Sequence, residues 1–165
     1  MKAFVSIIIG SKSDYEIMQN CSKTLDKFEV PYELIISSAH RSPKRTKDYM
    51  AESEAKGAKV FIAAAGMAAH LAGALAASTT KPVLGVPMAG SDLSGVDALY
   101  STVQMPAGMP VGTVAIGKAG AINSAYLAIQ ILATNSEELA SKLLEDRKEK
   151  AQKVVDDSKT IEVRL

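Results

Sequence analysis

Tryptophan is absent from this chain of 165 residues, and aromatic residues together make up only 5% of it. Surfaces that bind nucleic acid often stack bases on aromatic side chains, so this shortage argues against a nucleic-acid partner. The formal net charge is +1, which is too small to attract nucleic acid or an acidic membrane. No stretch approaches the roughly 20 apolar residues of a membrane-spanning helix. The composition therefore predicts neither a nucleic-acid nor a membrane partner.

Cysteine is nearly absent as well. Cys21 is the single cysteine, so no disulfide can form within the chain. It falls in a helical pattern with no activating base near it, and we interpret it as a buried apolar residue rather than a reactive thiol. The apolar run after Lys2 is short, and the polar residues 11–14 follow it instead of a small-residue cleavage site. We therefore expect a cytoplasmic protein.

The chain is rich in alternating strand-like and helix-like segments. Apolar or β-branched runs predict strands at 2–9, 32–37, 59–65, 82–87 and 111–116. Helical periodicity predicts helices at 16–28, 42–57, 68–78, 94–105, 121–133 and 136–157. Such alternation is typical of a parallel sheet covered on both faces. We expect an α/β protein, a three-layer αβα sandwich with a flavodoxin-like parallel sheet of about five strands and a C-terminal helix.

No linker interrupts this alternation, which predicts a single domain over 1–165, with 136–165 forming a C-terminal helix and tail. In such a sheet, ligands bind beyond the carboxyl ends of the strands, where the strand order reverses between strands one and three. That rule selects three loops for a binding site, at 10–14, 38–42 and 66–70.

The first loop reads "GSKSD" and places hydroxyl groups at the start of a helix. Ser11, Ser13 and the backbone N–H groups there can bind a phosphate. Asp14 can instead accept hydrogen bonds from both hydroxyls of a sugar diol. The alternative is a simple helix cap made by Ser13 or Asp14. The loop matches neither the Walker phosphate-binding loop nor the dinucleotide-binding glycine motif.

The second loop reads "SAHRS". Arg41 can hold a phosphate through two parallel hydrogen bonds, and the imidazole of His40 can exchange a proton near neutral pH. The alternatives are a surface arginine and a structural histidine. The pair follows an inner strand and directly precedes a helix with Ser42 at its N-cap and Pro43 at N1, and this placement favours a functional site.

The third loop, "AAAGMAAHLAG", ends its strand at Gly66. Its small residues let a ligand approach the backbone closely, or alternatively serve helix packing. Its His70 can orient a neighbouring group or contact the substrate. Neither of the two histidines has a cysteine or carboxylate beside it, so the sequence predicts no metal site. Asp92 and Asp97 are interpreted as helix-start residues.

Five motifs in order, "GSKSD", "SAHRSP", "AAHLAG", "PVLGVP" and "SGVDALYSTVQMPAGMPVGTVAIGKAGA", resemble the N5-carboxyaminoimidazole ribonucleotide mutase family of purine biosynthesis. The resemblance extends to about residue 133. It implies an enzyme that moves a carboxylate from the exocyclic nitrogen of the aminoimidazole ribonucleotide to ring carbon 4, without a cofactor or metal. It also implies a homo-octamer with active sites at subunit contacts.

The resemblance also assigns a role to each candidate residue. It implies that Ser11, Ser13 and Arg41 bind the 5′-phosphate and that Asp14 binds the ribose hydroxyls. It implies that His40 transfers the proton, and that the loop with His70 closes over the carboxylate and imidazole end of the substrate.

Two residues depart from the family pattern, which has glycine at Met67 and proline at Ala72. A related branch of enzymes carboxylates the aminoimidazole directly with carbon dioxide, but that branch has lysine after the loop histidine, where this chain has Arg41. The direct carboxylase and a non-catalytic nucleotide-binding module are the alternative functions. The charged tail after Glu145 is either a solvated extension or an arm on a neighbouring subunit. With the octamer that the resemblance implies, we expect the tail and the apolar segment 105–112 to make subunit contacts.

Overall fold

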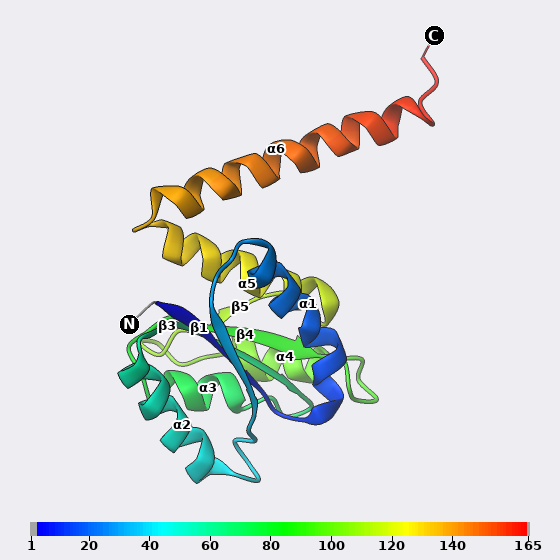
Figure 1. Cartoon of the computed structure of the whole chain (residues 1–165). Helices are drawn as coiled ribbons and strands as arrows, with labels where there is room; N and C mark the ends of the chain where they lie inside the picture. The colour runs from blue at the N-terminus through cyan, green and yellow to red at the C-terminus, as the bar shows by residue number, and fades with distance from the viewer. Residues whose placement is uncertain (1–2, 165) are drawn as a thin grey trace. The chain divides into compact units, whose positions relative to one another are not determined.

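In this computed structural model, which describes residues 3–164, segments between residues 4 and 113 form a five-stranded parallel sheet (Figure 1). The strand order is β2-β1-β3-β4-β5 and every neighbouring pair is parallel. The strands are β1 (Phe4–Ile9), β2 (Tyr32–Ile36), β3 (Ala58–Gly66), β4 (Val83–Met88) and β5 (Gly112–Thr113). The chain divides into two compact units after Ile129, and the sheet lies in the first. The expected flavodoxin-like α/β fold is confirmed.

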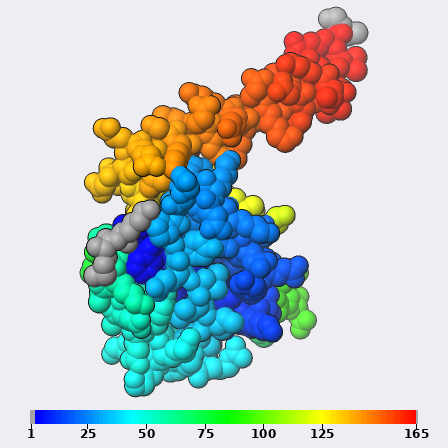
Figure 2. Space-filling view, in the orientation of Figure 1, coloured from blue at the N-terminus to red at the C-terminus, as the bar shows by residue number. Residues whose placement is uncertain are grey.

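The strands are apolar throughout because both faces of the sheet are covered. All six residues of β1, including Ser6, are buried, as are all six of β4. Figure 2 agrees with this burial: the blue-to-cyan segments cover most of the visible face of the first unit, and little of the darkest blue is seen.

The fifth strand is much shorter than the predicted 111–116. The N–H of Val114 still donates to the Gly85 carbonyl of β4 at 3.0 Å, and the N–H of Gly117 donates to the Pro87 carbonyl at 2.9 Å. The backbone nitrogen of Pro87 faces the same neighbouring segment as its carbonyl but has no N–H to donate. The hydrogen-bond ladder between β4 and β5 therefore ends there. The sequence prediction missed this interaction because the proline belongs to the neighbouring strand.

Five helices of the first unit alternate with the strands: α1 (Tyr15–Lys27), α2 (Pro43–Lys56), α3 (Leu71–Ala76), α4 (Val96–Val103) and α5 (Lys118–Ala133), whose last turn extends into the second unit. Residues of α2 and α3 share one core cluster with Phe4, Ile8 and Phe61 of the sheet. A Cβ atom on Gly85 would meet both Ala72 of α3 and Thr102 of α4, so α4 covers the same face.

The helices α1 and α5 cover the opposite face of the sheet. The hydroxyl of Ser124 in α5 lies 3.7 Å from the buried Cys21 sulfur of α1. A Cβ atom on Gly120 of α5 would lie 3.1 Å from Val86, whose side chain points away from the face of its neighbour Gly85. Burial raises the pKa of the Cys21 thiol to about 12, in agreement with its interpretation as an apolar residue.

Two helices begin two or three residues later than their sequence pattern predicts. The expected 94–105 helix starts at Val96, because Ser94 and Gly95 both have positive φ angles, 53° and 85°. The expected 68–78 helix starts only at Leu71, after a tight turn in which the His70 N–H donates to the Ala68 carbonyl at 2.8 Å. A helix cannot include residues in the left-handed region or a turn of this kind.

The second unit, Gln130–Leu165, consists mainly of the helix α6 (Glu137–Lys159). Ser136 caps this helix by accepting a hydrogen bond from the Leu139 N–H at 3.3 Å. Ion pairs spaced four residues apart, such as Lys153–Asp157 at 2.8 Å, connect successive turns. Among the described residues, no helix is long and apolar enough to cross a membrane.

Candidate active site

A pocket of about 560 Å³ opens at the carboxyl ends of β1, β2 and β3. It is lined by the three loops that the strand-order rule selects. All six predicted site residues line it: Ser11, Ser13, Asp14, His40, Arg41 and His70. The chain thus brings together side chains that are up to 59 positions apart in the sequence, as the switch-point rule predicts for this sheet.

The first loop forms a short 3₁₀ helix, η1 (Lys12–Asp14), before α1 begins. Ser11 caps η1: its Oγ accepts hydrogen bonds from the Ser13 backbone N–H at 3.4 Å and from the Ser13 hydroxyl at 3.0 Å. Asp14 occupies the N-cap of α1 but makes no side-chain capping bond. The capping alternative is therefore wrong for Ser13 and Asp14, and the Asp14 carboxylate is not used to cap the helix.

Asp14 is a buried carboxylate in the pocket wall, with only 8% of its surface exposed. Burial raises its pKa, while hydrogen bonds from the Ser11 backbone and the Ser13 side chain act in the opposite direction. The Ser13 hydroxyl donates only a long hydrogen bond to Asp14 Oδ1, at 3.5 Å. No ion pair to Asp14 is found among residues 3–164. The carboxylate therefore retains acceptor capacity for hydroxyl groups of a ligand.

Arg41 reaches from the second loop to the first. Its Nη2 donates to the Gly10 carbonyl at 3.2 Å, and its Nε lies 3.5 Å from the Ser38 Oγ. The Ser38 Oγ also accepts a hydrogen bond from the Arg41 backbone N–H at 3.1 Å. The guanidinium therefore lies beside the strand end from which the Ser11 and Ser13 hydroxyls follow. One cation and two hydroxyl groups at a helix start form a suitable site for a phosphate.

A network of serine and threonine hydroxyl groups stabilises the second loop. The Ser42 side chain does not cap α2; instead its Oγ accepts from the Ser38 N–H at 3.0 Å and donates to the Ser38 carbonyl at 3.1 Å. Ser37 and Thr46, both buried, join their hydroxyls at 2.8 Å, and Thr46 donates to the Ser42 carbonyl at 3.2 Å. The sequence prediction missed Ser37, Ser38 and Thr46, because serine and threonine near a helix start are too common to single out.

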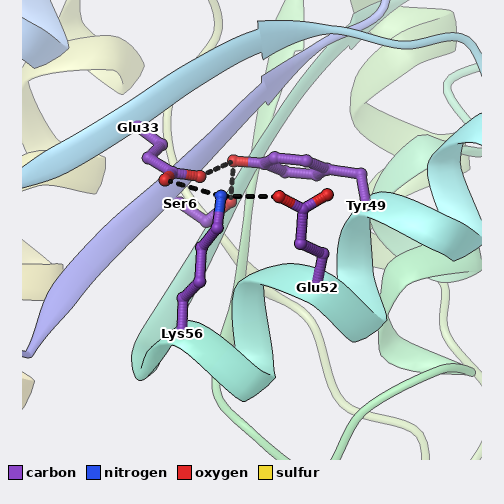
Figure 3. Close-up of polar contacts among 5 residues, drawn as sticks. All are labelled: Ser6, Glu33, Tyr49, Glu52 and Lys56. Carbon is purple, nitrogen blue, oxygen red and sulfur yellow. Dashed lines mark hydrogen bonds and ion pairs between the residues drawn. The ribbon is translucent and has the colours of Figure 1, made fainter. Parts of the chain in front are cut away.

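The helix α2 is also tied to the sheet by a polar network, drawn in Figure 3. The fully buried Ser6 of β1 donates to the Tyr49 hydroxyl at 3.0 Å, and Tyr49 donates to Glu33 of β2 at 3.1 Å. Lys56 pairs with Glu33 at 3.3 Å and with Glu52 at 2.6 Å. Burial is the main cause of the raised pKa of Tyr49. These contacts hold α2, the helix that directly follows the loop with His40 and Arg41.

The two histidines of the chain meet in the pocket. His40 Nε2 lies 2.6 Å from His70 Nδ1, and the rings meet edge to face with their centroids 4.7 Å apart. Both side chains are exposed to the pocket opening. One of the two facing nitrogens must carry a hydrogen for this contact to form, so the tautomer of one ring depends on the other. His70 was expected either to orient a neighbouring group or to contact the substrate, and in the structure it contacts the neighbouring His40.

The two departures from the family pattern lie in different environments. Met67 lines the pocket and has a positive φ of 56°. Ala72 is 3% exposed and belongs to the core cluster between α3 and the sheet. A Cβ atom on Gly85 would lie 3.4 Å from the Ala72 Cβ, so little space is left around it. Only Met67 can act on a ligand directly.

Comparison with known proteins identifies close relatives. The AIR carboxylase family model matches residues 4–153. The N5-carboxyaminoimidazole ribonucleotide mutase of Escherichia coli K12 is 50% identical over 93% of this chain and 91% of its own length. The enzyme of that name from Bacillus subtilis 168 is 49% identical, with coverage of 96% and 98%. The crystal structure of Treponema denticola PurE superposes with a TM-score of 0.89 at 25% identity, covering 98% of this chain and all of the other.

Proposed function

This chain belongs to the AIR carboxylase family, and we propose that it is an N5-carboxyaminoimidazole ribonucleotide mutase of purine biosynthesis. The reaction moves a carboxylate from the exocyclic nitrogen of the substrate to ring carbon 4. One observation carries the proposal for the site: a single pocket has a cation and hydroxyl groups at one side and a pair of contacting histidines at the other. A phosphorylated nucleotide that needs proton transfer at its base fits this division.

The first and second loops would bind the part of the substrate that does not react. Ser11, Ser13 and Arg41 hold the 5′-phosphate, and Asp14 accepts hydrogen bonds from the ribose hydroxyls. The burial of Asp14 supports this role, because a ligand that covers it adds little further desolvation. Binding energy gained at the phosphate can then be used to orient the imidazole ring at the histidines.

His40 would transfer the proton in both halves of the reaction. The exocyclic nitrogen takes a proton from His40 as its bond to the carboxylate breaks, and carbon dioxide leaves while the bonding electrons stay on nitrogen. Carbon 4 then attacks the trapped carbon dioxide, and its proton returns to His40 as the ring regains aromaticity. One group that acts first as acid and then as base is regenerated in each turnover.

His70 would support His40 rather than replace it. Its Nδ1 lies 2.6 Å from His40 Nε2, within hydrogen-bonding distance. A hydrogen bond at this position holds the His40 ring in one orientation and fixes which ring nitrogen faces the substrate. The loop that carries His70 would also cover the carboxylate end of the ligand.

We further propose a cytoplasmic homo-octamer with active sites at subunit contacts. Four exposed apolar side chains at and along α4 support the assembly: Leu93, Val96, Tyr100 and Val103. Val96, Tyr100 and Val103 are spaced four and three residues apart and therefore lie on one stripe of α4, which would be exposed to water in a monomer, and Leu93 precedes the helix. The second unit also exposes apolar Leu144, Val154 and Val155 on α6 and supports the proposal that 136–165 makes subunit contacts. Light scattering that shows a monomer would refute the assembly.

One assay tests the proposed activity against its alternatives. The carbamate substrate is offered without added bicarbonate, and the carbon-carboxylated product is measured above the rate without enzyme. The mutase should form that product. Product formed only from the uncarboxylated nucleotide with carbon dioxide would indicate the direct carboxylase. Binding of both nucleotides without any product would indicate a non-catalytic module.

A further inference from the structure

Met67 is the one large side chain in a stretch of very small residues. Every other residue from Ala63 to Ala69 is alanine or glycine. Met67 is 62% exposed and lines the same pocket as His40 and His70. It is therefore the only side chain in this stretch that is long enough to extend across the pocket opening.

The backbone at Met67 adopts a conformation that is unfavourable for a residue with a side chain. Its φ of 56° lies in the left-handed region, which residues with a Cβ atom rarely adopt. Among residues 3–164, Glu29 and Ser94 are the other non-glycine residues with positive φ, and neither lines the pocket. A glycine would adopt this conformation without strain. Strained residues of this kind cluster at active sites and ligand-binding positions.

The loop has little freedom to relieve the strain by moving. A Cβ atom on Gly66 would lie 3.2 Å from the Met88 carbonyl at the end of β4, so the strand end packs closely there. On the other side, the His70 N–H donates to the Ala68 carbonyl at 2.8 Å and closes a tight turn. Met67 is held between these two contacts, and its thioether is the part of the residue that can move.

The third loop contributes most of the apolar lining of the pocket. The first loop contributes hydroxyl and carboxylate groups, and the second contributes Ser38, His40 and Arg41 beside Ala39, whereas the third contributes Ala65, Met67, Ala68 and Leu71 beside His70. Carbon dioxide carries no net charge and is held chiefly by dispersion contacts, which a polarisable thioether provides well. An apolar wall beside the two histidines is where freed carbon dioxide would stay.

We propose that Met67 is an apolar cover over the histidine side of the pocket that retains freed carbon dioxide until carbon 4 captures it. This inference rests on the proposed mutase reaction, in which the gas is released and recaptured within one turnover. If the cover is removed, carbon dioxide escapes to water and the uncarboxylated aminoimidazole ribonucleotide remains in the pocket. The ratio of this by-product to the carboxylated product therefore measures retention directly.

The test compares Met67→Ala with Met67→Leu. Alanine removes the cover but keeps the Cβ atom, whereas leucine keeps an apolar side chain of similar volume in the same backbone conformation. The carbamate substrate is labelled with ¹³C in its carboxylate and supplied in buffer with unlabelled bicarbonate. By-product and label retained in the product are measured, with the decay of the carbamate without enzyme subtracted. We expect the by-product ratio to rise about tenfold in Met67→Ala and to stay close to wild type in Met67→Leu.

A second measurement uses the folded wild-type protein. Hydrogen peroxide transfers one oxygen atom to the Met67 sulfur and is reduced to water, which turns the apolar thioether into a polar sulfoxide. Met67 is the most exposed methionine among residues 3–164, and Met18, Met50 and Met88 are buried. Oxidation should raise the by-product ratio in the wild type and leave it unchanged in Met67→Leu, which controls for oxidation elsewhere.

Two results would overturn the inference. One is an unchanged by-product ratio in Met67→Ala and in the oxidised wild type, while both still form product. The other is a rise in Met67→Leu equal to that in Met67→Ala, which would assign the effect to the backbone. A wild-type protein that does not convert the carbamate at all would instead refute the proposed function, so the two failures are distinguishable.

Discussion

The hydroxyl pair beneath the His40–Arg41 loop gives a quantitative test of how α2 positions this loop. Thr46→Val replaces the hydroxyl by a methyl group of similar size. It removes the 2.8 Å contact with the Ser37 hydroxyl and the 3.2 Å bond to the Ser42 carbonyl. Ser37 is then left with Ser42 Oγ at 3.4 Å as its remaining hydroxyl neighbour. The perturbation is polar and leaves the packing volume nearly unchanged.

The expected loss of stability in Thr46→Val follows from the burial of the Ser37 and Thr46 hydroxyls. Ser37 is 1% exposed and Thr46 is 4% exposed, so water cannot replace the missing bond. A buried hydroxyl that loses its partner costs about 1–3 kcal/mol, which should appear in the free energy of unfolding. Because the same bonds shape the loop before Arg41, we also expect the KM for the nucleotide to rise about 5-fold, equivalent to about 1 kcal/mol.

Urea unfolding at a fixed protein concentration and steady-state kinetics measure these two effects. Thr102→Val is the matched control, since it removes a buried hydroxyl that donates to the Ala98 carbonyl at 2.7 Å within α4. It makes the same chemical change away from the loop, so its KM should equal that of the wild type. The reasoning is refuted if Thr46→Val has wild-type stability and KM, or if both variants raise KM equally.

Two further substitutions test the substrate-binding side of the pocket. Arg41→Lys should raise the nucleotide Kd about 10-fold or more, because lysine cannot form two parallel bonds to a phosphate; an unchanged Kd by calorimetry would exclude the phosphate role. Asp14→Asn should weaken nucleotide binding and stabilise the protein at pH 7. Burial raises the Asp14 pKa in the folded state, so the native protein holds this proton more tightly, and wild-type stability falls as pH rises from the unfolded to the folded pKa. The stability gain in unfolding experiments should therefore shrink as pH is lowered through that window, and a gain that grows in acid would contradict this sign.

The sequence predicted the elements that depend on local patterns. The run "FVSIII" predicts β1 because a strand covered on both faces needs no polar alternation, and all six residues are buried. Pro43 and Gly57 mark the ends of α2 as expected, with Gly57 at a φ of 106°. By contrast, the early end of β5 depends on the missing N–H of Pro87 in the neighbouring strand, and no pattern within 111–116 could reveal it.

The candidate site was predictable at the level of loops but not of contacts. The switch-point rule places residues 10–14, 38–42 and 66–70 around one pocket. The 2.6 Å contact between His40 and His70 depends on where α3 begins and on the turn before it. The support from Ser37 and Thr46 depends on side-chain directions that a one-dimensional pattern does not contain. The resemblance drew attention to Met67 and Ala72 alike, and only their burial separates a pocket residue from a core residue.

The activity of His40→Asn is the most direct test of the central claim that His40 transfers the proton. Asparagine keeps a polar side chain in the pocket but cannot gain or lose a proton near neutral pH. We expect conversion of the carbamate to fall by about 10²–10⁴-fold, as for the loss of a general acid–base group, while the nucleotide Kd stays close to that of the wild type. Turnover at the wild-type rate with the same Kd would contradict the account.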